Sequence, residues 1–189
     1  AHRITGNPLY ANVLVRTAQS LATRYDHDVG ALRSWSWGPW SYPVIIDNLM
    51  NLELLFWAAK HTGSGEFSTL AEAHAHTTRR EHVRADGSTF HLVDFDPVTG
   101  AVLSRGTWSG INHQSTWSRG QAWTVHGFAM CYREAGDPLF LDTAERAAVY
   151  FMDNLPPDGV PFWDFQAPGI PLTERDTSAA SIAASGLLE

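Results

Sequence analysis

One carboxylate stands at the end of an apolar run, where Asp47 follows Val44-Ile45-Ile46 and opens a largely apolar segment. Two interpretations are open. Asp is a good N-cap of a helix, a task that Asn48 or Asn51 could share. Alternatively, apolar neighbours disfavour the ionised carboxylate and raise its pKa, as a general acid near neutral pH requires. We take Asp47 as the candidate acid/base.

A cation and an indole form a second candidate group. Arg119 and Trp123 are four positions apart in a segment that we expect to begin a helix, so their side chains share a face. Arg can hold a carboxylate through two hydrogen bonds, and Trp can stack on a ring. The pair would suit an acidic sugar. The alternative is a surface Arg beside a core Trp.

Tryptophans gather in the predicted loops, which hold six of the eight. Trp35, Trp37 and Trp40 come just before Asp47. Aromatic rings lining a site with a few polar groups suit a flat ligand such as a sugar, so this loop predicts either a carbohydrate platform or a hydrophobic plug. The predicted loops are residues 25–43, 85–119 and 156–175.

The remaining nucleophiles and metal-ligand residue types point to no further chemistry. His74, His76 and His82 lack the i, i+4 spacing of a metal pair, so we expect neither a metal nor a cofactor. His91 lies on a predicted strand, where a lone His is more often structural. Cys131, the only cysteine, sits in an apolar run and predicts a buried, inert thiol.

A degenerate repeat organises the chain. Residues 5–10, 62–67 and 135–140 each place a Gly and a small polar residue before an aromatic one. Such joints connect antiparallel helices, so we predict an all-α frame of helical hairpins. Residues 88–95 and 101–103 predict a small β-hairpin inserted into it. The expected helices are 11–24, 47–61, 68–84, 121–134 and 141–154.

Composition excludes some partners. The net charge of −7 argues against a nucleic-acid binder. No stretch reaches the roughly 18 apolar residues of a membrane span, so we expect no membrane partner.

Four motifs carry a family resemblance. Together, and in order along the chain, they resemble the unsaturated glucuronyl hydrolases, glycoside hydrolase family 88. The segments containing Asp47 and Arg119 are the most specific. The motifs are Tyr42–Leu52, His91 with Asp94–Pro97, Trp117–Trp123, and Trp163–Phe165 with Arg175-Asp176.

The resemblance implies an (α/α)6 barrel of six helical hairpins. The repeat glycines are 57 and 73 positions apart, so six hairpins need roughly 390 residues. We therefore expect residues 1–189 to form part of a single catalytic domain, about three hairpins, truncated at both ends. A cytoplasmic location is also expected, since family members are mostly intracellular.

The resemblance also implies a reaction. The family removes a 4,5-unsaturated uronic acid from the non-reducing end of lyase-generated oligosaccharides, such as glycosaminoglycan fragments, by hydrating the C4=C5 vinyl ether. It implies that Asp47 protonates C4 and activates the water that adds at C5. His91 and Arg119 would bind the anionic substrate, with Trp35 and Trp123 as stacking platforms.

The chain departs from the family pattern at two points, and two alternative functions are open. Trp108-Ser109 replaces a family His-Gln pair, and a second family Asp is expected before residue 1; Asp28 falls at the wrong distance. An unsaturated rhamnogalacturonyl hydrolase is one alternative, although that type carries Arg-Gly-Asn-Gly-Trp where this chain has Arg119-Gly120-Gln121-Ala122-Trp123. The other is a non-catalytic carbohydrate-binding toroid with Asp47 as a cap.

Overall fold

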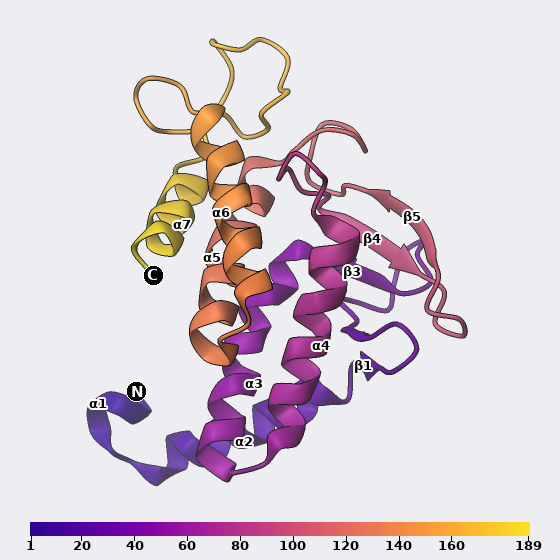
Figure 1. Cartoon of the computed structure of the whole chain (residues 1–189), viewed down its shortest axis with the longest axis vertical. Helices are drawn as coiled ribbons and strands as arrows, with labels where there is room; N and C mark the ends of the chain where they lie inside the picture. The colour runs from indigo at the N-terminus through magenta and orange to yellow at the C-terminus, as the bar shows by residue number, and fades with distance from the viewer.

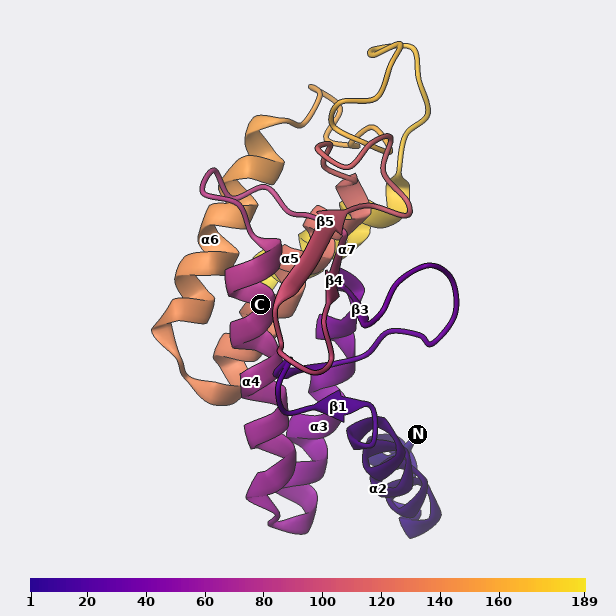
Figure 2. The same ribbon diagram turned by 90° about the vertical axis from the view of Figure 1, so that its right-hand side faces the viewer.

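Helices make up about 53% of the chain, and two small antiparallel sheets accompany them, in a computed structural model that describes residues 1–189. Helices α3 to α6 run side by side, and the larger sheet lies along one flank of them (Figures 1 and 2). None of the helices combines the length and apolarity needed to cross a membrane. The helices are α1 (His2–Thr5), α2 (Pro8–Ala22), α3 (Leu49–Thr62), α4 (Gly65–His82), α5 (Ser118–Ala135), α6 (Pro138–Asp153) and α7 (Thr177–Leu188), with a 3₁₀ turn η1 (Ile46–Asn48). The strands are β1 (Tyr25–Asp26), β2 (Ala31–Leu32), β3 (Pro43–Ile45), β4 (Leu92–Phe95) and β5 (Val102–Gly106).

The repeated joints have the predicted geometry. Gly6, Gly63 and Gly136 each follow the last residue of a helix with φ between 66° and 75°, a left-handed conformation that glycine adopts without steric cost. The next residue caps the following helix, and the side chains of Asn7 and Asp137 accept a backbone N–H there. The prediction of helices joined at these three points is confirmed.

The core fixes α3 against α5. Leu52 and Leu55 are fully buried on α3, and Phe128 and Cys131 are fully buried on α5. Burying one such apolar side chain contributes about 1.5–3 kcal/mol. Burial also raises the pKa of the Cys131 thiol, as expected for an inert cysteine. This contact matters for the site because α3 follows Asp47 in the chain and α5 carries the Arg119 motif.

The larger sheet contains the predicted hairpin, because β4 pairs antiparallel with β5, and it adds a third strand that was not predicted. It has three strands in the order β3-β4-β5, and β3 pairs antiparallel with β4 through Val44 and Val93. The apolar run before Asp47 is therefore a strand, because its β-branched residues suit a buried sheet, and α3 begins at Leu49 rather than at Asp47. Strand β4 begins at Leu92, so His91 lies directly before it.

Two buried histidines of α4 support the strands. His74 Nδ1 accepts a hydrogen bond from Leu32 N at 2.9 Å, and His82 Nε2 lies 2.9 Å from Val44 O. Burial lowers the pKa of His74 to about 3 and that of His82 to about 4. Both rings are therefore neutral near pH 7 and serve as structural hydrogen-bond partners.

Candidate active site

Backbone pairing places Asp47 beside His91. Ile46 N donates to His91 O at 2.9 Å, which continues the β3–β4 ladder by one step. The chain then turns into η1, whose second residue is Asp47. The N-cap of α3 is Asn48, whose side chain instead donates to Leu32 O. The capping interpretation of Asp47 is therefore wrong, and its carboxylate is left for another role.

The Asp47 carboxyl is held in a partly desolvated position. Its side chain is 29% exposed, yet its Oδ2 atom is covered by protein and has no hydrogen-bond partner. Burial raises the pKa of Asp47 to about 6. Three smaller effects oppose this rise: a hydrogen bond from its own backbone, the positive charge of Arg119, and a hydrogen bond from the Trp123 side chain. The arrangement suits a carboxylic acid that donates a proton near neutral pH.

His91 is a neutral hydrogen-bond donor facing Asp47. Its Nδ1 accepts backbone N–H groups from Trp108 at 3.1 Å and Ser109 at 3.2 Å. Burial lowers the pKa of His91 to about 3, so the single ring proton must sit on Nε2. That Nε2 lies 3.6 Å from Asp47 Oδ2, which is longer than a hydrogen bond.

Arg119 is oriented by the start of α7. Its Nη1 donates to Ser178 Oγ at 3.1 Å, and its Nε lies 3.6 Å from Asp176 Oδ2. Asp176 also caps α7. The Arg119 side chain is still 42% exposed, so part of the guanidinium remains free for an anionic ligand.

Close packing brings α5 against η1. A Cβ on Gly120 would lie 3.0 Å from the Trp117 ring and 3.3 Å from Ile46 Cγ2. Glycine therefore permits the approach that sets Arg119 and Trp123 beside Asp47. The neighbouring Gln121 is fully buried, and it donates to two backbone carbonyls of other segments, so it supports this geometry.

The loop carrying Trp35 is tied to the strand that leads to Asp47. Ser34 Oγ accepts Ile45 N at 2.9 Å. The Trp35 ring stacks on Trp37, with centroids 5.1 Å apart and planes 19° apart. Trp35 can therefore offer at most one ring face to a ligand.

Four candidate residues from the sequence lie together here: Asp47, His91, Arg119 and Trp123. The sequence did not indicate that Asp164 also supports the site. Asp164 is fully buried, and its Oδ2 accepts Ile111 N at 3.0 Å and Ser115 Oγ at 2.7 Å. Asp164 therefore anchors residues 111–115 of the loop after β5, while His91 holds residues 108–109 of the same loop. In the sequence, Asp164 belongs to a motif that indicates only a family resemblance. Its partners lie about 50 positions away, so no local pattern predicts these hydrogen bonds.

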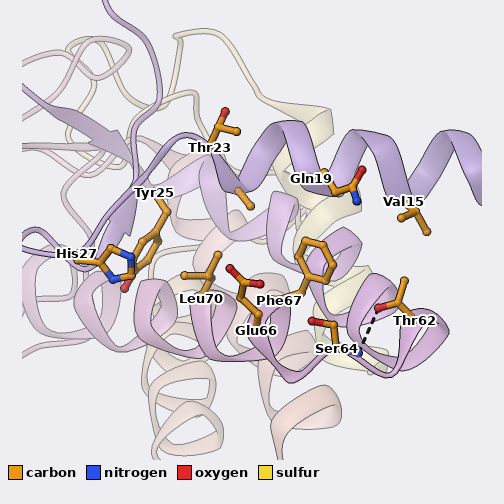
Figure 3. Close-up of a pocket in the computed structure, with 11 residues that line it drawn as sticks. Val15, Gln19, Thr23, Tyr25, His27, Thr62, Ser64, Glu66, Phe67 and Leu70 are labelled. Atoms are coloured by element: carbon orange, nitrogen blue, oxygen red, sulfur yellow. Dashed lines mark hydrogen bonds between the residues drawn. The ribbon is translucent and has the colours of Figure 1, made fainter.

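A separate hollow of about 510 Å³ lies between α2 and α4 (Figure 3). Gln19 projects from α2, Phe67 and Leu70 from α4, and Tyr25 and His27 from the segment after α2. Its lining residues include none of Asp47, His91, Arg119 and Trp123. The hollow is therefore separate from the candidate active site.

Known proteins match this arrangement, although no family model matches the chain. The unsaturated glucuronyl hydrolase of Formosa agariphila is 44% identical over 187 residues, which are 97% of this chain and 47% of that protein. That of Bacillus sp. strain GL1 is 45% identical over 177 residues, 91% of this chain and 46% of that protein. The structure of an unsaturated glucuronyl hydrolase specific for heparin superposes with a TM-score of 0.97 at 43% identity, covering 100% of this chain and 51% of that one.

These relatives are glycoside hydrolases of family 88. The chain is homologous to the unsaturated glucuronyl hydrolases among them over nearly its whole length, so the resemblance predicted from the motifs is confirmed. It spans about half the length of the curated relatives that it matches.

Proposed function

We propose that the protein removes a 4,5-unsaturated uronic acid from the non-reducing end of anionic oligosaccharides by hydrating its C4=C5 bond. One observation carries the proposal. Asp47 is a carboxylic acid with a pKa raised to about 6, an unpartnered Oδ2 atom, and Arg119 and Trp123 close enough to influence that pKa.

The proposed reaction begins with protonated Asp47. Its proton goes to C4 of the vinyl ether, and the cation that forms at C5 is stabilised by the ring oxygen. Water then adds at C5 and returns a proton to the Asp47 carboxylate. The net change is addition of one water molecule, and the resulting hemiketal opens and releases the remaining saccharide. Donation to carbon requires an acid that is still protonated near neutral pH, which burial provides.

The surrounding groups have complementary roles. The exposed part of Arg119 would bind the substrate carboxylate, because a guanidinium pairs strongly with that group. The Trp123 ring would stack on the unsaturated sugar. The Nε2 proton of His91 would donate to Asp47 or to a substrate oxygen. A related unsaturated glucuronyl hydrolase has been solved with dGlcA-Glc-Rha-Glc, at a TM-score of 0.92 and 40% identity, which supports an unsaturated oligosaccharide as the ligand.

For the whole protein, we propose an (α/α)6 toroid with a single catalytic domain, of which residues 1–189 form about three hairpins. The three glycine joints and the similarity to half of a solved relative support this.

A cytoplasmic location is proposed on the family resemblance alone, and cell fractionation would test it.

A thio-linked substrate tests the reaction most sharply. Hydration of C4=C5 does not displace the group at C1, so an unsaturated uronide with a sulfur glycosidic link should lose its ultraviolet chromophore at nearly the rate of the oxygen-linked compound. A direct displacement would consume the oxygen-linked substrate alone. If neither compound loses absorbance, the proposed hydrolase activity is wrong.

The unsaturated rhamnogalacturonyl hydrolase remains the second candidate, since it shares the chemistry. In this motif the two candidates differ at Gln121 and at Ala122, and Gln121 is buried here and donates to Gly87 O and Ala147 O. Comparing the turnover of unsaturated glucuronyl and rhamnogalacturonyl disaccharides decides between them. A binding protein without catalysis would bind both and consume neither.

A further inference from the structure

Four indoles from two loops form one cluster, which we call the indole wall: Trp35, Trp37, Trp40 and Trp108. The first three belong to the loop between β2 and β3, which projects away from the helices in Figure 2. Trp108 comes from the loop after β5. Its ring meets Trp40 edge-on at 5.3 Å and 83°, and Trp37 at 6.3 Å and 78°. The two loops therefore present one continuous aromatic surface.

The outer rings of the indole wall face solvent. Trp37 is 58% exposed and Trp108 is 62% exposed. A plug would bury these rings. Trp35 stacks behind Trp37, and Trp40 contacts Trp108, so the inner pair holds the outer pair in fixed orientations. Rigid, exposed aromatic faces of this kind bind a ligand with little loss of side-chain entropy.

Both loops of the indole wall are tied to the candidate acid. The imidazole of His91 faces Asp47 through Nε2 and holds Trp108 N through Nδ1. On the other side, Ser34 Oγ holds Ile45 N, two residues before Asp47. The backbone of Trp108 is therefore linked to the Asp47 carboxyl through one side chain, that of His91.

The chemistry of the two loops selects an uncharged ligand face. The two loops, residues 33–42 and 107–117, contain one Arg and one His and no other charged residue. Arg33 donates to Ser41 O, and His113 Nδ1 accepts Thr107 N, so both are engaged within their own loops. Indole faces attract apolar C–H surfaces, and the four indoles offer no cation to pair with a sulfate or carboxylate. We infer that Trp37 and Trp108 form a second sugar platform, which binds the uncharged face of the pyranose linked to the unsaturated uronic acid. This inference rests on the proposed function.

Two substrates separate this platform from the reacting site. One is an unsaturated uronyl disaccharide whose second sugar carries no sulfate, and the other is the methyl glycoside of the same uronic acid, which lacks that ring. Trp108→Ala and Trp37→Ala should each raise the KM of the disaccharide about 3- to 10-fold more than the KM of the methyl glycoside, since one aromatic contact is lost. Trp57→Ala is the matched control, because that indole stacks on His61 in α3 and should leave the ratio unchanged.

An equal change for both substrates, or no change, would overturn the platform. If the wild-type protein consumes neither substrate, the proposed function fails, and the platform is then tested by binding. A saturated, unsulfated disaccharide should quench the intrinsic fluorescence of the wild-type protein, and Trp108→Ala should weaken its apparent affinity about 3- to 10-fold. The same affinity in both proteins would refute the platform.

Discussion

His91 Nε2 lies 3.6 Å from Asp47 Oδ2, while Nδ1 of the same ring accepts two backbone N–H groups of the 107–115 loop. One neutral imidazole therefore links the candidate acid to the loop that carries Trp108. Because its two nitrogens have different partners, the ring can take only one tautomer, and its proton is directed toward the carboxyl group.

Replacing His91 should separate these two roles. His91→Ala removes the Nδ1 acceptor of the two loop N–H groups and the imidazole beside the acid, and we expect kcat/KM to fall about 10- to 100-fold, a loss of about 1–3 kcal/mol. The loop should also become more sensitive to proteolysis. His91→Gln supplies an acceptor and a donor and should restore part of both properties. His61→Ala, at the far end of α3, is the control. Wild-type kinetics and proteolysis in His91→Ala would remove both roles.

Asp47→Asn should stabilise the fold above pH 6. The pKa of Asp47 rises from an ordinary 3.8 to about 6, so the folded state binds the proton more tightly than the unfolded state does. The stability contributed by that proton is fully present below pH 3.8 and is lost as the pH rises through 6. At pH 8 the ionised carboxylate therefore costs up to about 3 kcal/mol, which Asn avoids.

Chemical denaturation of both proteins at pH 4 and pH 8 measures this effect. The stability difference in favour of Asn should grow as the pH rises. A difference that is the same at both pH values would mean that Asp47 is not desolvated.

Removing the charge of Arg119 should shift the pH dependence of kcat. A nearby cation favours the ionised carboxylate, so Arg119→Gln raises the pKa of Asp47 further and shifts the fall of kcat at high pH to still higher pH. The KM should also rise about 10- to 100-fold, because a charge-assisted contact with the substrate is lost. Arg119→Lys should keep the profile close to that of the wild type. An unshifted profile in Arg119→Gln would show that its charge does not act on the acid.

Gly120→Ala should disturb the site through packing. The added Cβ would crowd Ile46 and the Trp117 ring, and overpacking of this kind costs about 1–3 kcal/mol, only partly offset by better helix propensity. Activity should fall with stability, because Ile46 directly precedes Asp47. Gly65→Ala is the matched control, since its Cβ would meet nothing within 4 Å. Equal melting temperatures for the two variants would contradict the account of α5 packing.

The parts of the fold that could be predicted from the sequence have local causes. A glycine followed by a capping residue determines its own turn, so the joints at Gly6, Gly63 and Gly136 were foreseeable. The four-residue spacing of Arg119 and Trp123 likewise follows from helix geometry. Strand β3 was missed because the run before Asp47 was interpreted only as a lead-in to a helix. Its partner β4 lies about 50 residues further along the chain, and no local sequence pattern predicts that pairing.

The site could be predicted only in part, for the same reason. Asp47 stood out because its neighbours are apolar, and the motifs indicated His91. The double contact of His91, the anchoring by Asp164 and the addition of Trp108 to the tryptophans before Asp47 all depend on contacts made by distant segments. The candidate reacting groups could therefore be predicted from the sequence more fully than the groups that position them.

Loss of substrate chromophore by Asp47→Asn tests the central claim most directly. Asn cannot donate a proton to C4, and removing a general acid typically costs about 10²–10⁴-fold in rate. We therefore predict a fall of that size in kcat for an unsaturated uronyl disaccharide, with the fold preserved. Asp28→Asn, at an exposed carboxylate, should retain the wild-type rate. Turnover by Asp47→Asn at the wild-type rate would contradict the assignment of Asp47 as the acid.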